Sequence, residues 1–277
     1  MRSLIVDARE LLRPIPGSRG GAGCDLRDEV DWTSPYQRLR SARNDARVAE
    51  RENDRSTDPW IRSTVPTHWN TVVEASLACF ARSRDFDVAC WLAEALSRLH
   101  GVAGFAAGLD LLTGLCDRYW DAGFPVALPS EEATGGVEWE DRESPILGLF
   151  GDTQLGTVLR HLWLRPLYEA AYGPVSLHHL CRGLGLPAYR ELDAPVAARR
   201  TAQDASYVTE EARAAIALLR VETPMLLAAA HRLEARLAQH LPTTAASVTP
   251  KIVDFDEAVR DVAEIIGAPA APRPHYC

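Results

Sequence analysis

Lysine is almost absent from this 277-residue sequence. Lys251 is the only lysine among 30 basic residues and the rest are arginines, a bias that genomic base composition can produce as well as function. Acidic residues number 38, and the formal net charge is −8. Non-specific binding to nucleic acid needs a basic face that releases counterions from the phosphates. The acidic balance therefore predicts no nucleic-acid partner, although it leaves room for a local arginine patch.

Long apolar runs and an export signal are also missing. Apolar residues make up 47% of the chain, which is ample for a core, but no uninterrupted run reaches the ~18 residues of a membrane-spanning helix. The start of the chain carries acidic residues in a helical pattern, whereas a signal peptide has a basic segment followed by an apolar one. We therefore expect a cytoplasmic protein without membrane insertion, with one or two domains.

Paired cysteines are absent as well. The six cysteines, at positions 24, 79, 90, 116, 181 and 277, form no CxxC pair. Three of them, Cys79, Cys90 and Cys116, lie among apolar residues inside predicted helices. A chain of this size without an export signal is not expected to be held by disulfides. These thiols are therefore predicted to be reduced and to act as small apolar side chains.

No signature of catalysis or of metal binding is present. The patterns GxxxxGK[ST], GxSxG and HExxH do not occur. His178 and His179 point to different faces of a helix, and with Cys181 they lack a fourth ligand. The acidic stretch from Glu131 to Glu143 does not follow the spacing of a calcium-binding loop. We predict no catalytic residue, no cofactor and no metal site.

Helical periodicity, in contrast, is strong between residues 68 and 125. Apolar residues recur at helical spacing and predict three helices on short turns, over residues 68–83, 85–100 and 102–119. The second helix is apolar on most sides, and we expect Trp91 and Leu96 to lie at the centre of a water-free stack. Gly101 is placed to end this helix, because glycine takes a positive φ without a Cβ clash.

Two glycines interrupt the third helix at a spacing of four residues. A glycine within a helix costs about 0.5–1 kcal/mol relative to alanine. Gly104 and Gly108 lie on one face of the helix, so we expect that the backbone of another helix approaches closely there.

The remainder of the chain predicts further helices and no convincing strand. The fold class is therefore all-α: a bundle of antiparallel helices with a Pro/Gly-rich N-terminal wrap over residues 14–31 and an additional C-terminal helical segment. We assign residues 1–150 to a first helical domain, 151–241 to a second helical segment and 242–277 to a linker, a short helix and a disordered tail. The expected elements are helices over 3–13, 36–52, 153–172 (kinked or broken at Pro166), 176–184, 209–241 (split at Pro224) and 255–266, a loop over 53–66 anchored by Trp60, and a linker over 242–250.

Charged and aromatic residues stand at the ends of the three central helices. His100 is expected to bond the last carbonyls of the second helix. The pairs Arg84–Asp85 and Trp120–Asp121 allow two interpretations. One is an intramolecular ion pair or hydrogen bond that locks the helical hairpin. The other is a docking surface, because tryptophan and arginine are frequent interface anchors.

Short motifs in the first half of the chain together form a fairly specific signature. They are Pro14–Gly17, Gly23–Arg27, Tyr36–Arg40, Ser83–Phe86, Trp91–Leu92, Ala95–Leu96, Leu99–Gly101, Gly104–Phe105, Gly108–Leu109, Tyr119–Asp121, Pro125, Arg142 and Pro145–Leu147. In these motifs the sequence resembles the ImpA N-terminal domain family, whose members are TssA-like components of bacterial type VI secretion systems. The resemblance marks the following as structural or interface residues: Arg84, Asp85, Trp91, His100, Gly101, Gly104, Gly108, Trp120, Asp121 and Arg142.

The resemblance implies a cytoplasmic protein that assembles others and is not an enzyme. Expected partners are the baseplate component TssK, the Hcp tube, the VgrG spike and the TssB–TssC sheath. Family members usually carry a further C-terminal domain that forms rings. This sequence stops soon after the predicted linker, so it is either a fragment that lacks this domain or a short variant with a different role. Ring formation is therefore not carried over, and residues 153–241 are the candidate for a smaller homo-oligomer. The alternatives are a regulatory or ligand-sensing helical module unrelated to secretion, and an enzyme that uses His100 or the acidic stretch.

Overall fold

The computed structural model describes residues 6–129, 137–151, 156–171, 173–187, 209–246 and 248–268. Residues 130–136, which include part of the acidic stretch, and the predicted tail after residue 268 lie outside this part. The elements are α1 (Ala8–Leu11), the 3-10 turns η1 (Arg19–Gly21) and η2 (Leu26–Asp28), α2 (Pro35–Arg55), α3 (Pro59–Ser63), α4 (His68–Phe80), α5 (Phe86–Tyr119), β1 (Leu128–Pro129), β2 (Val137–Glu138), α6 (Glu140–Phe150), α7 (Thr157–Leu164), β3 (Pro166–Ala170), β4 (Gly173–Ser176), α8 (Leu177–Gly183), α9 (Glu210–Leu237), α10 (Pro242–Ala245) and α11 (Pro250–Ile266).

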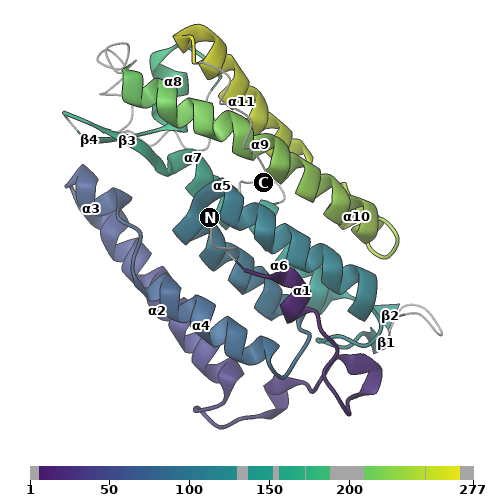
Figure 1. Cartoon of the computed structure of the whole chain (residues 1–277). Coiled ribbons are helices and arrows are strands. Elements are labelled where there is room, and N and C mark those ends of the chain that lie inside the picture. The colour runs from purple at the N-terminus through teal and green to yellow at the C-terminus, as the bar shows by residue number, and fades with distance from the viewer. Residues whose placement is uncertain are drawn as a thin grey trace.

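The helices form layers on the two sides of α5 (Figure 1). α2 and α4 pack against each other, and α4 contacts one side of α5. α9 packs along α5 on the other side and is itself covered by α11. The fold is therefore an all-α bundle, as the sequence predicts.

Gly101 divides α5 into two antiparallel halves. Its backbone has φ 64° and ψ −138°, which is not helical. A Cβ atom on Gly104 would lie 2.0 Å from the carbonyl oxygen of Leu96, and one on Gly108 would lie 2.4 Å from Cβ of Ala93. The three predicted central helices are thus α4 and the two halves of α5. The close approach predicted at both glycines occurs between those halves.

A single hydrophobic core extends through most of the described chain. Its largest fully buried apolar side chains include Trp69 on α4, Phe105 on α5, Phe150 on α6 and Phe255 on α11. The core continues past residue 150 and does not by itself mark a boundary there. The domain boundary that we placed at residue 150 therefore stays a prediction.

The N-terminal segment crosses the lower end of the central helices, as predicted for a wrap (Figure 1). The carbonyl of Ala22 accepts a hydrogen bond of 2.8 Å from the backbone N–H of Arg84, and the hydroxyl of Tyr119 donates to the carbonyl of Leu12 at 2.9 Å. Ala22 and Leu26 are fully buried. The irregular loop is therefore held by backbone hydrogen bonds and by two apolar anchors.

The prediction that the chain forms no strands is wrong, because two short antiparallel strand pairs are present. β1 pairs with β2, and β3 pairs with β4, both antiparallel. The predicted helix over 153–172 includes α7, which ends at Leu164, and Pro166 begins β3. Proline disfavours the helical conformation of the residue before it, so the chain continues in an extended form.

Other boundaries also differ from the prediction. α9 continues through Pro224, which lies on the exposed side of the helix. Proline has no backbone N–H, so the carbonyl four residues before it loses its helical hydrogen bond. On the exposed side of the helix, water can donate to that carbonyl instead. The predicted linker over 242–250 contains α10 and the fully buried Val248. The predicted loop over 53–66 contains α3, and its supposed anchor Trp60 is 41% exposed.

By length and composition alone, α5 and α9 could each cross a membrane. In the most apolar window of α5, however, 67% of the residues are buried inside the bundle, and for α9 the share is 39%. Gly101 also interrupts α5 with non-helical backbone, so α5 is not one continuous helix. Packing within the bundle accounts for the apolar character of α5.

Candidate functional site: buried arginine contacts and an arginine groove

Asp85 begins α5 and lies at the centre of a buried ion-pair cluster. Its side chain accepts a hydrogen bond from the backbone N–H of Val88 at 3.2 Å, as N-cap residues do. Arg27 of the N-terminal wrap donates to Asp85 Oδ2 at 2.5 Å and to Asp87 Oδ2 at 2.6 Å. One guanidinium thus ties the wrap to the start of the central helix.

Burial and the contacts with Arg27 act in opposite directions on the pKa values of this cluster. Burial raises the pKa of Asp85 to about 6, although the hydrogen bond and the charge of Arg27 act to lower it. Burial lowers the pKa of Arg27, but hydrogen bonding to Asp85 and Asp87 and the charge of Asp85 outweigh it and raise this pKa above its ordinary value. Tyr36 donates to Asp87 at 3.3 Å, and burial raises the Tyr36 pKa to about 12.

Arg84 and Asp85 do not pair with each other. Arg84 is 4% exposed and donates to the backbone carbonyls of Arg13 and Phe80. Burial lowers the pKa of the Arg84 guanidinium. The contacts of both residues are intramolecular, and they join the wrap and the end of α4 to the start of α5.

Asp85→Ala is expected to lower the free energy of unfolding by about 2 kcal/mol. A broken buried pair commonly costs 3–5 kcal/mol, but Arg27 keeps Asp87 as a partner. Urea denaturation measures the change. An unchanged stability together with lost partner binding would instead favour the docking interpretation of this motif.

Arg142 of α6 is enclosed by carbonyls and aromatic rings. It is 1% exposed and donates to the carbonyls of Pro125 at 2.7 Å, Gly123 at 2.5 Å and Trp120. Its guanidinium carbon lies 4.3 Å from the ring centre of Trp139. Burial lowers the pKa of Arg142 to about 10. This arginine closes the turn after α5 against α6.

The helix end at His100 differs from the prediction. His100 is exposed, and the carbonyls of Ser97 and Arg98 are bonded instead by Arg165, at 3.3 Å and 2.9 Å. Arg165 follows α7, so the sequence did not indicate that it reaches the turn at Gly101. The capping role belongs to Arg165.

The remaining motif residues separate into buried and exposed ones. Trp120 is buried and stacks on His240 with ring centres 4.2 Å apart, whereas Asp121 is exposed. Trp91 is only partly buried, in contrast to Leu96, which is 1% exposed. The expectation of a water-free environment is therefore wrong for Trp91.

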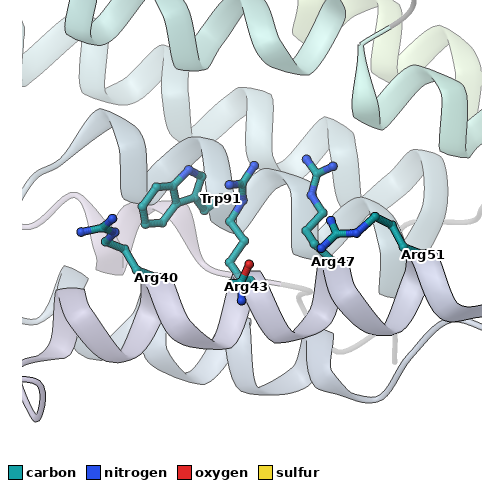
Figure 2. A pocket seen from close by; sticks show the side chains of 6 residues that line it. Arg40, Arg43, Arg47, Arg51 and Trp91 are labelled. Atoms are coloured by element: carbon teal, nitrogen blue, oxygen red, sulfur yellow. The ribbon is translucent and has the colours of Figure 1, made fainter.

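Trp91 lines an open groove together with one face of α2. The cavity measures ≈ 380 Å³, and its lining residues are Arg40, Arg43, Asn44, Arg47, Arg51 and Trp91. Figure 2 shows four arginines projecting from α2 on the side where Trp91 lies. We call this feature the arginine groove. The sequence allows for a local arginine patch. The three- and four-residue spacing of these arginines on one helix could have located it.

Glu94 lies beneath the groove. Its carboxylate is 1% exposed and binds Arg43 Nε at 2.8 Å and Arg47 at 2.6 Å. Arg98 bonds Glu50 at 2.6 Å, which also accepts from the indole of Trp69 at 2.9 Å. These bonds join α2, α4 and α5. They were not predicted, because their partners lie 19 or more residues apart in the sequence.

His161 on α7 gives the bundle a defined response to acid. Its Nε2 atom is buried without a hydrogen bond to the described residues. Burial, followed by the charges of Arg98 and Arg165, lowers the pKa of His161 well below its ordinary value. Below pH ~6.5 the unfolded chain therefore binds a proton that the folded chain does not, so stability falls with decreasing pH.

At pH 5.5 this histidine is expected to cost up to about 1.4 kcal/mol relative to pH 7.5. Urea denaturation of the wild type and of His161→Gln at both values isolates its contribution. Equal pH dependence of the two proteins would contradict the assignment.

No cluster of three His, Cys, Asp or Glu side chains suited to a metal ion occurs in the described part of the chain. The described motif residues instead build a helical scaffold. Comparison with a family model of the N-terminal region of ImpA, a type VI secretion system protein, gives a match over residues 12–146. This region is similar to the ImpA N-terminal domain. The match spans the Asp85 cluster, the Arg142 contacts and the arginine groove.

A curated relative shows the same similarity. Over 163 residues, or 58% of this chain, the sequence is 28% identical to the type VI secretion system component TssA1 of Pseudomonas aeruginosa. The matched region covers 43% of that protein, so the chain spans less than half of its length.

A solved structure has the same fold. It is the N-terminal domain, including the ImpA N-terminal region, of the TssA component of the type VI secretion system from Burkholderia cenocepacia. The likeness covers 98% of this chain and 96% of that one, with a TM-score of 0.60 and 24% sequence identity. Taken with the family match and the curated relative, the chain is similar to TssA components of type VI secretion systems.

Proposed function

We propose that this protein is a non-enzymatic assembly component of a bacterial type VI secretion system. In the cytoplasm it recruits baseplate, tail-tube and sheath components. The observation that carries the proposal is the match of residues 12–146 to the ImpA N-terminal domain. Its chemistry is surface complementarity between proteins.

The geometry of the family motif supports this function. Arg84, Asp85 and Arg142 are each no more than 4% exposed and direct their polar atoms to partners within the chain. We propose that they keep the bundle rigid, so that its exposed faces hold a fixed shape. A preformed surface binds with a smaller entropic cost than one that orders on contact.

The experiment is affinity capture with the full chain as bait. TssK, Hcp, VgrG and the TssB–TssC sheath are offered separately as purified proteins. We expect specific capture of at least one of them. Failure to capture any of them would contradict the proposal. It would favour the alternative of a regulatory or ligand-sensing module.

A further inference from the structure

The arginine groove has a regular arrangement of positive charge. Arg40, Arg43, Arg47 and Arg51 stand three, four and four residues apart on α2. At about 1.5 Å per residue, they rise along the helix in steps of about 4.5, 6 and 6 Å. The groove is therefore a row of guanidinium groups about 16 Å long, with Trp91 in its wall.

The positive charge of this row is only partly neutralised. Arg43 and Arg47 share the single carboxylate of Glu94. Within the described ranges, neither Arg40 nor Arg51 has an ion pair, and both side chains are exposed. Nε of Arg47 is buried and has no hydrogen-bond partner among the same residues. The groove thus has a positive excess in a chain whose net charge is −8.

Two arginines of the groove already bind a carboxylate. Glu94 accepts from Arg43 at 2.8 Å and from Arg47 at 2.6 Å. A guanidinium group has five N–H donors in a fork that fits carboxylate oxygens, and these bonds use only part of that capacity. Further carboxylates are a chemically suitable ligand for the donors that face the opening.

The spacing also selects the form of the ligand. In an extended peptide, side chains on one face repeat every two residues, or about 6.6 Å. That repeat is close to the steps of about 6 Å between Arg43, Arg47 and Arg51 along α2. An extended segment with acidic residues at alternate positions can therefore place one carboxylate near each arginine. Its intervening side chains would face away from α2.

We propose that the arginine groove is a docking site for an extended acidic segment of a partner protein. This deepens the proposed function, and it rests on that function for the statement that the ligand is a protein. The site requires a short run of Asp or Glu at alternate positions. Arg40 and Arg51 attract the ends of the segment, and the Arg43–Arg47 pair holds its centre.

A nucleic acid fits the molecule less well. The groove offers four arginines over one helical face, while the rest of the chain carries excess negative charge that repels a long polyanion. A short peptide meets only the positive row. The partner is therefore better described as an acidic peptide, and nucleic acid becomes a competing outcome of the test.

The test measures binding of a fluorescein-labelled peptide to the full chain by fluorescence anisotropy. The probe has nine residues, with aspartate alternating with serine, and its control has asparagine in place of aspartate. We expect saturable binding of the acidic probe alone, weakened by added salt. The double variant Arg40→Glu/Arg51→Glu should bind it at least about tenfold more weakly, because two attractions become repulsions.

Arg40 and Arg51 are chosen because they are exposed and form no ion pair in the described part of the chain, so the variant is expected to fold. The matched control is Arg38→Glu/Arg62→Glu, which makes the same charge change at two exposed arginines outside the groove. It should retain binding within about twofold. Circular dichroism and urea denaturation verify that both variants are folded.

Several results would overturn the proposal. The first is equal binding of the acidic and the neutral peptide. The second is equal weakening of binding in both double variants. The third is displacement of the probe by inorganic phosphate or by a nine-nucleotide single strand at lower concentration than by unlabelled peptide. A salt-sensitive dimer of the chain that is lost only in the groove variant would assign the groove to a second copy. Peptide binding without capture of any secretion component would leave the groove assignment standing and contradict the proposed function.

Discussion

Gly108→Leu is expected to lower the free energy of unfolding by about 4 kcal/mol, or to prevent folding. The two halves of α5 are so close that even a Cβ atom at this position would lie 2.6 Å from the Cα of Ala93. Backbone atoms cannot rotate away as a flexible side chain can, so the halves must separate. Overpacking of a core usually costs 1–3 kcal/mol, and the added leucine side chain enlarges the separation.

A matched control for this substitution exists on α6. Gly148 is exposed within that helix, and a Cβ atom there would meet nothing within 4 Å. Gly148→Ala should therefore stabilise the protein by about 0.5–1 kcal/mol, because alanine favours the helix. Gly108→Ala should destabilise it. Thermal and urea denaturation that ranked the two alanine variants equally would show that close helix contact is not what Gly108 provides.

The sequence was sufficient to predict the central helices and the break between them. Their apolar residues repeat at helical spacing, and Gly101 is placed to end the second helix. The four-residue interval between Gly104 and Gly108 predicted the close approach of another helix without identifying which one. These signals are local, so they can be interpreted without knowing the neighbours. The observed φ of 64° at Gly101 is the conformation that this reasoning required.

The second hairpin, β3–β4, could not be predicted in the same way. All four residues of β4 are buried, so the strand shows no alternation of polar and apolar side chains. The residues of β4 that pair with β3 show neither a helical repeat of apolar side chains nor an alternation of polar and apolar ones. A short buried run of this kind cannot be distinguished from a helix segment by periodicity.

Polar contacts over long sequence distances were the largest part of the site that the sequence did not reveal. Arg165 bonds carbonyls 67 and 68 residues before it, and Arg27 binds Asp85 across 58 residues. The sequence around an arginine does not indicate which distant residue it will bond. Glu94 and Arg98, four residues apart in an apolar run, were nevertheless a usable signal, because charges rarely enter a core without partners.

Arg142→Ala is expected to lower the free energy of unfolding by about 4 kcal/mol or more. The substitution removes the donors of three buried hydrogen bonds, to the carbonyls of Trp120, Gly123 and Pro125. Each buried group without a partner costs about 1–3 kcal/mol, and water can satisfy only some of them. It also empties the space between the rings of Phe86 and Trp139, whose centres lie 4.6 Å and 4.3 Å from the guanidinium carbon.

Two further variants separate the causes of this loss. Arg142→Lys keeps a positive charge but cannot bond three carbonyls in a planar fork, so it should recover only part of the stability. Arg160→Ala removes an exposed arginine from α7 and should change stability by less than about 0.5 kcal/mol. Near-ultraviolet circular dichroism should also change in Arg142→Ala, because Trp120 and Trp139 lose a guanidinium that lies close to both rings. If Arg142→Ala unfolded at the same urea concentration as Arg160→Ala, Arg142 would not be the residue that closes α6 on the turn after α5.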